Sequence, residues 1–415
     1  MALTPTQRQQ ARSMGMNVDW AEELLSFIGI RPDLATFPME YYTPEGANLS
    51  DTNFAETLTT AVAAAQEAGG GVVQIPAGTW NIGTSEFVIV SAGRDKPLYI
   101  EGAGINTTSL LVDEGYTGTV FHLTGLPGDG AADLYYYGGI ANMTIGCGTV
   151  DVSTTGTGIK ISSCINTQFL NLDIRNFLGG VGFRSTFTAP DFTNQYVQLY
   201  NVTCATNDTN FYLTSFVNGQ GFGVFANDGA TREFLCDDVK AAFFGGNFQS
   251  SAPVCFEMAG NGGCSISIHH FYYEGTAGTL FKASSPAISN NELAIYNFDQ
   301  GAGATIFLDA GQFNNVSVFA GNGITNSTTI YKGVNGPNVT LYNIADPVTA
   351  ASKFNLDAAS RRALTCLGFG VAFAMQHLFT PTTGAPANGP SLYVDADGSL
   401  KFKGAGGTVT TLAPT

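Results

Sequence analysis

The fold is decided by a series of short stretches in which apolar and polar residues alternate, beginning with NMTIG (Asn142–Gly146), NLDIRNF (Asn171–Phe177) and QLYNVT (Gln198–Thr203). Further stretches are SISIHHF (Ser265–Phe271), LAIYNF (Leu293–Phe298), NVSVF (Asn315–Phe319) and NVTLYNI (Asn338–Ile344). Alternation that is rich in β-branched and aromatic residues is typical of β-strands and lacks the 3.6-residue period of helices. The sequence therefore predicts many short strands, separated by Gly, Asn and Ser.

The strands recur at a nearly constant spacing. Counted from the last apolar residue of each stretch, the steps are 29, 28, 69, 27, 21 and 25 residues, and the long step is expected to contain two to three more strands, one of them near Phe248. Because one strand cannot bury its apolar face alone, this period predicts coils that stack on each other. The L-x-x-L-x-L spacing of leucine-rich repeats is absent. We predict an all-β, single-stranded parallel β-helix of about ten coils, with left-handed asparagines stacked in ladders at the coil corners.

The composition agrees with a β-rich protein that has few surface charges. The chain has 415 residues, of which 44% are hydrophobic, 12% are charged and 51 are glycine. This hydrophobic content excludes disorder, and the few charges argue against a helical bundle. The net charge of −16, without a Lys/Arg cluster, argues against nucleic acid as a partner. No apolar run is long enough to span a bilayer, so no membrane insertion is predicted.

No cofactor or metal is predicted. The seven cysteines form no C-x-x-C pair, and we interpret them as buried thiols of a reducing compartment in preference to a disulfide framework or a zinc site. The N-terminal sequence lacks the hydrophobic region of a signal peptide, which predicts assembly in a cytoplasm.

The first edge of a coil stack exposes unpaired strand groups and needs a cover. We predict an amphipathic helix over residues 53–68, with Asn53 and Glu56 as its capping box and Gly69–Gly71 at its end. Phe54, Leu58, Val62 and Ala65 would form its apolar face. The strand VVQIP (Val72–Pro76) follows.

Composition divides the chain into four parts. They are a terminal segment over residues 1–45 with a short helix at Asp19–Ile28, the β-helix over residues 46–345, a helical segment (Lys353–Leu367) and linker over residues 346–390, and a β-hairpin over residues 391–415 that a third strand can extend. The hairpin has an alternating apolar face that needs a partner, which predicts a role in oligomerisation.

Two stretches carry a family resemblance. DTNFAETLTTAVAAAQEAGGGVVQIPAGTWNI (Asp51–Ile82) resembles the entry of the pectate-lyase-like superfamily, with Trp80 at the usual Tyr position, and this implies a right-handed parallel β-helix. The ending Y-V-D-x-D-G-x-L-K-x-K-x-G-x-G-T-V (Tyr393–Val409) resembles one that is common in bacteriophage structural proteins. Together they resemble a phage tail spike or tail fibre. This implies a homotrimer whose N-terminal segment attaches to a tail or baseplate protein of the virion, assembled in the host cytoplasm.

Carboxylates, histidines and tyrosines gather between residues 230 and 275. A glycoside hydrolase needs two carboxylates about 5–5.5 Å apart for retention or about 6.5–9.5 Å apart for inversion. The carboxylates available there are Glu233, Asp237, Asp238, Glu257 and Glu274. From these we select Asp238 and Glu274 as the catalytic pair, and His269, Tyr272 and Tyr273 as sugar-binding residues.

Strand alternation makes these assignments more specific. It places adjacent Asp237 and Asp238 on opposite faces, so at most one of them joins a given site. It also places His270 with Ile268, opposite His269 and Tyr273. A second pair, Asp173 and Arg175, would share an outer strand face, most simply in ion pairs between coils.

Three functions remain open at this stage. The chain is a virion spike or fibre that binds host-surface polysaccharide, with or without cleavage; or a stand-alone polysaccharide hydrolase or lyase; or a purely structural virion β-helix. The absence of G-H-G and R-I-K motifs argues against pectin hydrolysis. Few arginines and no calcium loop make a hydrolase the better candidate of the two depolymerase types.

Overall fold

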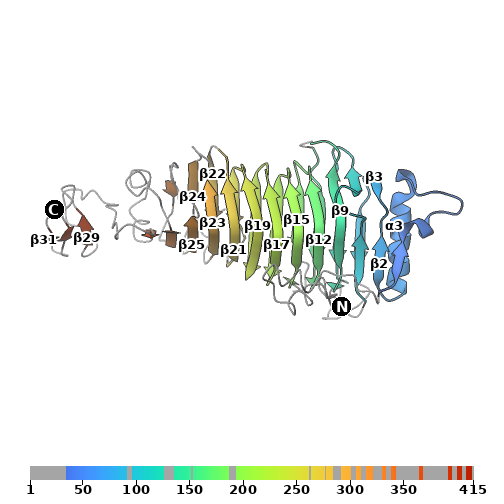
Figure 1. Ribbon diagram of the computed structural model, residues 1–415, viewed down its shortest axis with the longest axis horizontal. Coiled ribbons are helices and arrows are strands. Elements are labelled where there is room, and N and C mark those ends of the chain that lie inside the picture. Colours follow the sequence, from blue (N-terminus) through green and yellow to red (C-terminus); the bar gives the residue numbers. More distant parts are fainter. Residues whose placement is uncertain are drawn as a thin grey trace, which may run out of the picture.

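The computed structural model is an elongated stack of parallel coils (Figure 1). It describes residues 34–90, 96–125, 135–150, 153–186, 193–260, 263–275, 277–283, 291–300, 305–309, 315–320, 330–332, 338–342, 364–367, 391–394, 400–403 and 408–413. From β15 to β27 (residues 198–342), the described strands alternate between a first sheet, sheet A, and a second, sheet B, and successive coils pair in parallel. The predicted single-stranded parallel β-helix is thereby confirmed.

Two sheets run along the stack. Sheet A has the order β1 (Thr36–Pro38), β2 (Gly71–Gln74), β5 (Leu98–Glu101), β9 (Gly139–Cys147), β12 (Gln168–Arg175), β15 (Gln198–Ala205), β17 (Gln220–Asn227), β19 (Ala242–Ser250), β21 (Ser265–Tyr273), β23 (Glu292–Gln300), β25 (Asn315–Ala320), β27 (Asn338–Tyr342) and β28 (Leu364–Leu367), with β3 (Gly78–Gly83) and β6 (Thr108–Val112) alongside. Sheet B has the order β4 (Phe87–Val90), β7 (Thr119–Thr124), β10 (Thr157–Ser162), β13 (Val181–Thr186), β16 (Thr209–Val217), β18 (Arg232–Lys240), β20 (Val254–Met258), β22 (Ala277–Ala283), β24 (Thr305–Asp309) and β26 (Ile330–Lys332), with β8 (Tyr135–Tyr136), β11 (Cys164–Ile165) and β14 (Asn194–Gln195) alongside.

All seven stretches that predict strands lie in sheet A, in β9, β12, β15, β21, β23, β25 and β27. The 69-residue step contains two further strands of sheet A, β17 and β19, and Phe248 lies in the second. Their sequences, QGFGVFAN and AFFGGNFQS, are interrupted by glycines, which hides the alternation.

A column of phenylalanines fills the interior along sheet B. Phe183, Phe211, Phe234 and Phe256 occupy the same register position on successive strands, and all four are buried. Their ring centroids lie 6.2, 5.1 and 5.1 Å apart along the column. Each buried ring contributes about 1.5–3 kcal/mol from burial, and each ring pair about 0.5–1.5 kcal/mol more. The column therefore holds neighbouring coils together.

Left-handed asparagines lie at coil corners, as expected, where Asn166, Asn176 and Asn218 directly follow strand ends, and they also lie at the centres of strands. Asn142, Asn171 and Asn201 have φ of 59°, 50° and 51° in the middle of β9, β12 and β15. The ladder itself is confirmed, because Nδ2 of Asn171 donates to Asn142 (2.8 Å) and Nδ2 of Asn201 donates to Asn171 (2.9 Å). At each bend the alternation slips by one residue. The buried neighbours of Asn171 are consequently Phe169 and Leu172, three positions apart.

An amphipathic helix covers the first coils, as predicted (Figure 1). Helix α3 (Asp51–Glu67) begins two residues before residue 53, and the backbone N–H of Ser50 donates to Oδ1 of Asn53 (2.8 Å). The assignment of Glu56 to the capping box was wrong: Ser50, in an extended conformation, is the N-cap, and Asn53 is its partner three residues on. The expected apolar face is buried: Phe54, Leu58, Val62 and Ala65.

The stack extends beyond both expected boundaries. Strand β1 pairs with β2, and Met39 behind it is buried, so part of the segment over residues 1–45 belongs to the β-helix. At the other end, Leu364–Leu367 is not helical as expected but forms β28, which pairs with β27. The open edge of β27 provides backbone partners, and these outweigh a weak helical pattern. The expected helix at Asp19–Ile28 and the linker over residues 381–390 lie outside the described residues.

The closing hairpin is confirmed. Strands β29 (Ser391–Val394) and β30 (Leu400–Lys403) pair antiparallel, and β31 (Val409–Ala413) adds the third strand.

Six cysteines are free and buried: Cys147, Cys164, Cys204, Cys236, Cys255 and Cys264. Within the ranges given above, no helix is both long and apolar enough to cross a membrane.

Candidate functional site

Six aromatic side chains form a continuous column on the outer surface of sheet A. This aromatic face consists of Tyr200, Phe222, Phe243, His269, Tyr296 and Phe319, from β15, β17, β19, β21, β23 and β25. Ring centroids of successive members lie 4.6–5.8 Å apart. Strand register explains most of the alignment, because Tyr200 pairs with Phe222, His269 with Tyr296, and Tyr296 with Phe319.

The column changes geometry at Phe243. The register position between Phe222 and His269 is occupied by Gly245, and the Phe243 ring fills that space, 3.5 Å from where a Cβ of Gly245 would lie. The ring is tilted by 46° to Phe222 and by 50° to His269, whereas Tyr296 and Phe319 stack within 9°. Parallel stacking covers ring faces, so an uncovered face is available where the rings tilt. Phe222 is 42% exposed, so this break is the most accessible part of the face.

The surroundings of the aromatic face are polar, and on five of its six strands they are uncharged. Strands β15, β17, β19, β21 and β25 contain no Asp, Glu, Lys or Arg, although the whole chain carries a net charge of −16. Strand β23 carries Glu292 and Asp299. Side-chain amides lie beside the rings, and Gln168 Nε2 donates to Gln198 Oε1 (3.1 Å). Burial, and to a lesser extent His270, lowers the pKa of His269, so its imidazole is neutral at neutral pH. Such a surface offers aromatic and amide contacts to a neutral ligand.

The three sugar-binding residues proposed from the sequence differ in whether they reach the surface. His269 belongs to the aromatic face, and Tyr272 is half-buried on the same strand. Tyr273 is fully buried and is therefore a core residue that cannot contact an external ligand. His270 is exposed instead of pointing inward with Ile268, because its φ of 61° bends the strand and shifts the alternation by one residue.

The proposed carboxylate pair is not brought together. Asp238, near the end of β18, forms an ion pair with Lys240 (2.8 Å), just before β19 begins at Ala242. Glu274 accepts a hydrogen bond from Gln249 at the far end of β19 (2.8 Å). Seven residues of extended strand separate the ends of β19, which places the two carboxylates more than about 20 Å apart. A hydrolase pair needs at most about 9.5 Å.

The other surface carboxylates of residues 230–275 are Asp237 and Glu257. Asp237 and Asp238 are both half-exposed rather than opposite, because Asp238 has a φ of 56°. Glu257 binds Arg232 (3.3 Å) and Lys282 (3.2 Å) on sheet B. Glu257 is therefore held in local ion pairs.

Glu233 points into the interior and is fully buried. Its carboxylate accepts hydrogen bonds from Nδ2 of Asn210 and from the backbone N–H of Gly229. Burial raises its pKa to about 7, although both hydrogen bonds act in the opposite direction. No surface ligand can reach this group.

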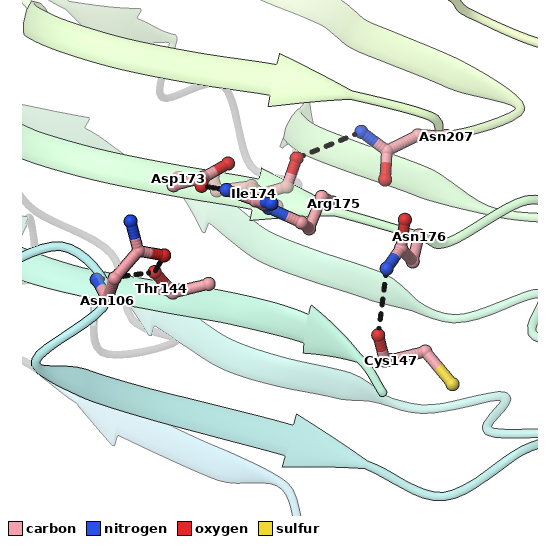
Figure 2. A network of polar contacts seen from close by, with 8 residues as sticks. All are labelled: Asn106, Thr144, Cys147, Asp173, Ile174, Arg175, Asn176 and Asn207. Carbon is pink, nitrogen blue, oxygen red and sulfur yellow. Dashed lines mark hydrogen bonds and ion pairs between the residues drawn. The ribbon is translucent and has the colours of Figure 1, made fainter. Parts of the chain in front are cut away.

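Asp173 and Arg175 share the outer face of β12, as expected, but they pair with each other and not with a neighbouring coil (Figure 2). The same view shows how asparagines close the coil corners: Asn176 donates to the carbonyl of Cys147 (3.0 Å) and Asn207 to that of Ile174 (3.2 Å). These contacts satisfy backbone groups where strands end, so we assign this cluster a structural role.

Five members of the aromatic face were not identified from the sequence: Tyr200, Phe222, Phe243, Tyr296 and Phe319. A usable signal exists for some of them, because the aromatic residue directly precedes a residue with positive φ. The pairs are Tyr200–Asn201, Phe222–Gly223, His269–His270 and Tyr296–Asn297.

In the part of the chain that is described, no three His, Cys, Asp or Glu side chains are grouped so that they could hold a metal ion.

Comparison with solved structures identifies the fold. The DFA-IIIase of Arthrobacter chlorophenolicus A6 in complex with GF2 aligns over 80% of this chain and 93% of its own, with 11% identity and a TM-score of 0.54. The same enzyme without its lid aligns over 81% and 99%, with 11% identity and a TM-score of 0.53. The A-module of the mannuronan C-5 epimerase AlgE6 of Azotobacter vinelandii aligns over 81% and 100%, with 13% identity and a TM-score of 0.46. No family model and no curated protein sequence matches the chain.

The likeness to the two DFA-IIIase structures defines a class by its fold. The chain is a right-handed parallel β-helix. At such low identity the likeness assigns no activity.

Proposed function

We propose that the protein binds a polysaccharide along the aromatic face of sheet A. The observation that carries this proposal is the column of six rings on the outer surface, which is most exposed at Phe222, beside the tilted ring of Phe243. Exposed aromatic residues normally occur singly, and a contiguous set of them marks an interaction surface. The face crosses six strands of sheet A, about 24 Å at the spacing of parallel strands, which suits an extended chain better than a small molecule.

The chemistry of the face favours an uncharged stretch of glycan. Ring faces provide apolar contact for the C–H groups of a sugar, and the neighbouring Gln and Asn amides can donate to and accept from hydroxyl groups. Binding is proposed without cleavage, because the carboxylates selected as a catalytic pair lie at opposite ends of β19.

We further propose that the chain serves as a virion tail spike or tail fibre, as a homotrimer that presents the β-helix to a host-surface polysaccharide. The entry resemblance at Asp51–Ile82 and the ending at Tyr393–Val409 support this proposal. The three-stranded sheet β29–β31 supplies a small separate element after the β-helix, in the position where such proteins carry an oligomerisation tip. In this proposal, the part of residues 1–45 that precedes β1 provides the attachment to the virion tail or baseplate.

The test is binding of the full chain to an array of bacterial surface polysaccharides. Phe222→Ala combined with Phe243→Ala should weaken binding to the polysaccharide that wild type selects by about ten-fold or more, since each ring contact is worth about 1 kcal/mol. Tyr41→Ala is the matched control, because Tyr41 is an 82% exposed aromatic outside the face. Unchanged binding by the double variant would refute the proposal. So would a double variant whose only defect is a change of oligomeric state in sedimentation, since the face would then be a subunit interface.

A further inference from the structure

The outer surface of sheet B carries a second column, made of basic residues. His122 on β7, Lys160 on β10 and Arg184 on β13 occupy the same register position on three neighbouring strands. Tyr212 on β16 follows in register, and the Arg184 guanidinium lies over its ring, 4.9 Å from the centroid. All four side chains are half-buried and face outward.

This arrangement is unusual for its part of the chain, because the other Lys and Arg side chains described between residues 135 and 283 are paired. Between residues 135 and 283 the described chain has six Lys and Arg side chains. Four of them have carboxylate partners: Arg175 with Asp173, Arg232 and Lys282 with Glu257, and Lys240 with Asp238. Among the residues described, no ion pair reaches Lys160 or Arg184. The two unpaired cations are therefore direct neighbours.

The nearest carboxylate, that of Glu86, does not serve Lys160 as an ion-pair partner. Glu86 acts on Lys160 through its charge, but its Oε1 accepts the backbone N–H of Thr119 (3.2 Å). Burial, and after it the Arg184 charge, lowers the pKa of Lys160, which shows that the ammonium lacks full compensation. Nε of Arg184 is buried without a hydrogen-bond partner. Like charges directly opposite each other on neighbouring strands destabilise a sheet. In the unliganded protein, this column of cations therefore lowers the stability of the fold.

Hydrogen-bonding groups lie beside the cations. Nε2 of His122 is 2.8 Å from Oγ of Ser162, and that hydroxyl donates to Oγ1 of Thr124 (3.0 Å). The ring of Tyr212 holds the planar guanidinium in place by a cation–π contact. An ammonium and an oriented guanidinium side by side match the oxygens of an oxyanion, which can accept charge-assisted hydrogen bonds from both.

We propose that Lys160 and Arg184, supported by His122 and Tyr212, form a binding site for an oxyanion substituent of an acidic polysaccharide, either a carboxylate or a sulfate ester. The site lies on the other sheet from the aromatic face. Binding of an oxyanion there stands on this site's own geometry, whereas the choice of a polysaccharide as its carrier rests on the proposed function. The bound oxyanion provides the counterion that the chain itself does not supply. The acidic net charge of the chain limits binding to this local site, which distinguishes it from a general polyanion surface.

The experiment compares three polymers with one backbone: unmodified dextran, dextran sulfate and carboxymethyl dextran. Wild-type protein at low salt should bind one or both acidic polymers and not unmodified dextran, with affinity falling as salt rises. Lys160→Gln and Arg184→Gln should each weaken this binding about ten-fold or more. Arg184→Lys keeps the positive charge but loses the planar guanidinium with its paired donors, so its affinity should lie between those of wild type and Arg184→Gln. Comparison of carboxymethyl dextran with dextran sulfate shows whether the site binds a carboxylate or a sulfate ester.

Lys240→Gln is the matched control, because it removes the same charge from the same sheet at an exposed ion pair. It should change binding less than two-fold or so. Thermal unfolding provides the structural readout: loss of a like-charge neighbour should leave the midpoint unchanged or raised for Lys160→Gln. The proposal is overturned if wild type binds neither acidic polymer, if it binds unmodified dextran equally, or if Lys240→Gln is as damaging as Lys160→Gln.

Discussion

Asn171 donates a hydrogen bond from Nδ2 to Oδ1 of Asn142 (2.8 Å), one coil earlier, and accepts one from Nδ2 of Asn201 (2.9 Å), one coil later. All three residues have positive φ. A single residue type thus satisfies two demands, because asparagine tolerates the left-handed bend and its amide connects neighbouring coils.

Asn171→Ala should lower the free energy of unfolding by about 2–4 kcal/mol, because it loses two hydrogen bonds and places a Cβ-bearing residue without local hydrogen bonding in the left-handed region. Asn171→Gly keeps the bend and should lose about half as much. Urea unfolding followed by circular dichroism measures both. Equal losses for the two variants would show that the bend contributes nothing.

The inner and outer aromatic columns should respond differently to truncation. Phe234 is fully buried between Phe211 and Phe256, so Phe234→Ala should cost about 3–5 kcal/mol of stability. Tyr296 lies on the outer surface between His269 and Phe319, and Tyr296→Ala should cost roughly 1 kcal/mol. The same urea assay compares them. If Tyr296→Ala is as destabilising as Phe234→Ala, the outer column is a structural element and not a binding surface.

Glu233 should make the protein less stable as pH rises. Its pKa of about 7 in the folded state lies above the ordinary value of 4.5, so its favourable contribution is complete below pH 4.5 and is lost between pH 4.5 and 7. Glu233→Gln removes this loss and should be more stable than wild type at pH 8, by up to about 3 kcal/mol. Thermal unfolding from pH 4 to 8 measures the difference. Glu274→Gln, at an exposed carboxylate, should leave the profile unchanged, and a wild-type profile for Glu233→Gln would contradict the assignment.

His122 should have the opposite effect. Burial, and after it the Lys160 charge, lowers its pKa to about 4, below the ordinary 6.5. The unfolded chain therefore binds a proton first, and stability is lost as pH falls from 6.5 towards 4. His122→Gln should flatten this part of the profile, and Lys160→Gln should raise the His122 pKa, which NMR titration of the imidazole reads directly. A pKa near 6.5 in wild type would exclude this environment.

The proposed homotrimer predicts a mass of three chains, each of 43.5 kDa, in sedimentation. Deletion of residues 391–415 removes β29–β31 and should weaken or abolish association while leaving the β-strand signal in circular dichroism. A wild-type monomer would refute the trimer. An intact trimer after deletion would place the interface on the β-helix itself.

Much of the fold could be predicted because one strand pattern repeats. Stretches such as NLDIRNF and LAIYNF show the alternation of a half-buried strand, and their spacing indicates stacked coils. The bends within strands were not predicted, because a sequence such as that around Asn171 fits the end of a strand as well as a bend within it. The helical interpretation of Leu364–Leu367 was wrong because the deciding contact, with β27, is distant in sequence.

The site was harder to predict, for two physical reasons. Strict alternation assigned His270 to the interior and Tyr273 to the surface, and the positive φ of His270 reverses both. Proximity in sequence suggested that Asp238 and Glu274 meet, but a coil of this size carries them to opposite ends of β19. The aromatic face is spread over residues 200–319, so only the register of six strands brings its members together.

Helix α3 closes the N-terminal end of the stack, and this gives the molecule a direction of growth. Each finished coil presents one free edge, on the side away from α3, and the next coil to leave the ribosome is the segment that pairs with it. Contacts between coils are made with the nearest neighbours only, so no coil has to wait for a distant part of the chain. The protein can therefore be built in the order in which it is synthesised, with α3 as the seed and every coil as the template for its successor.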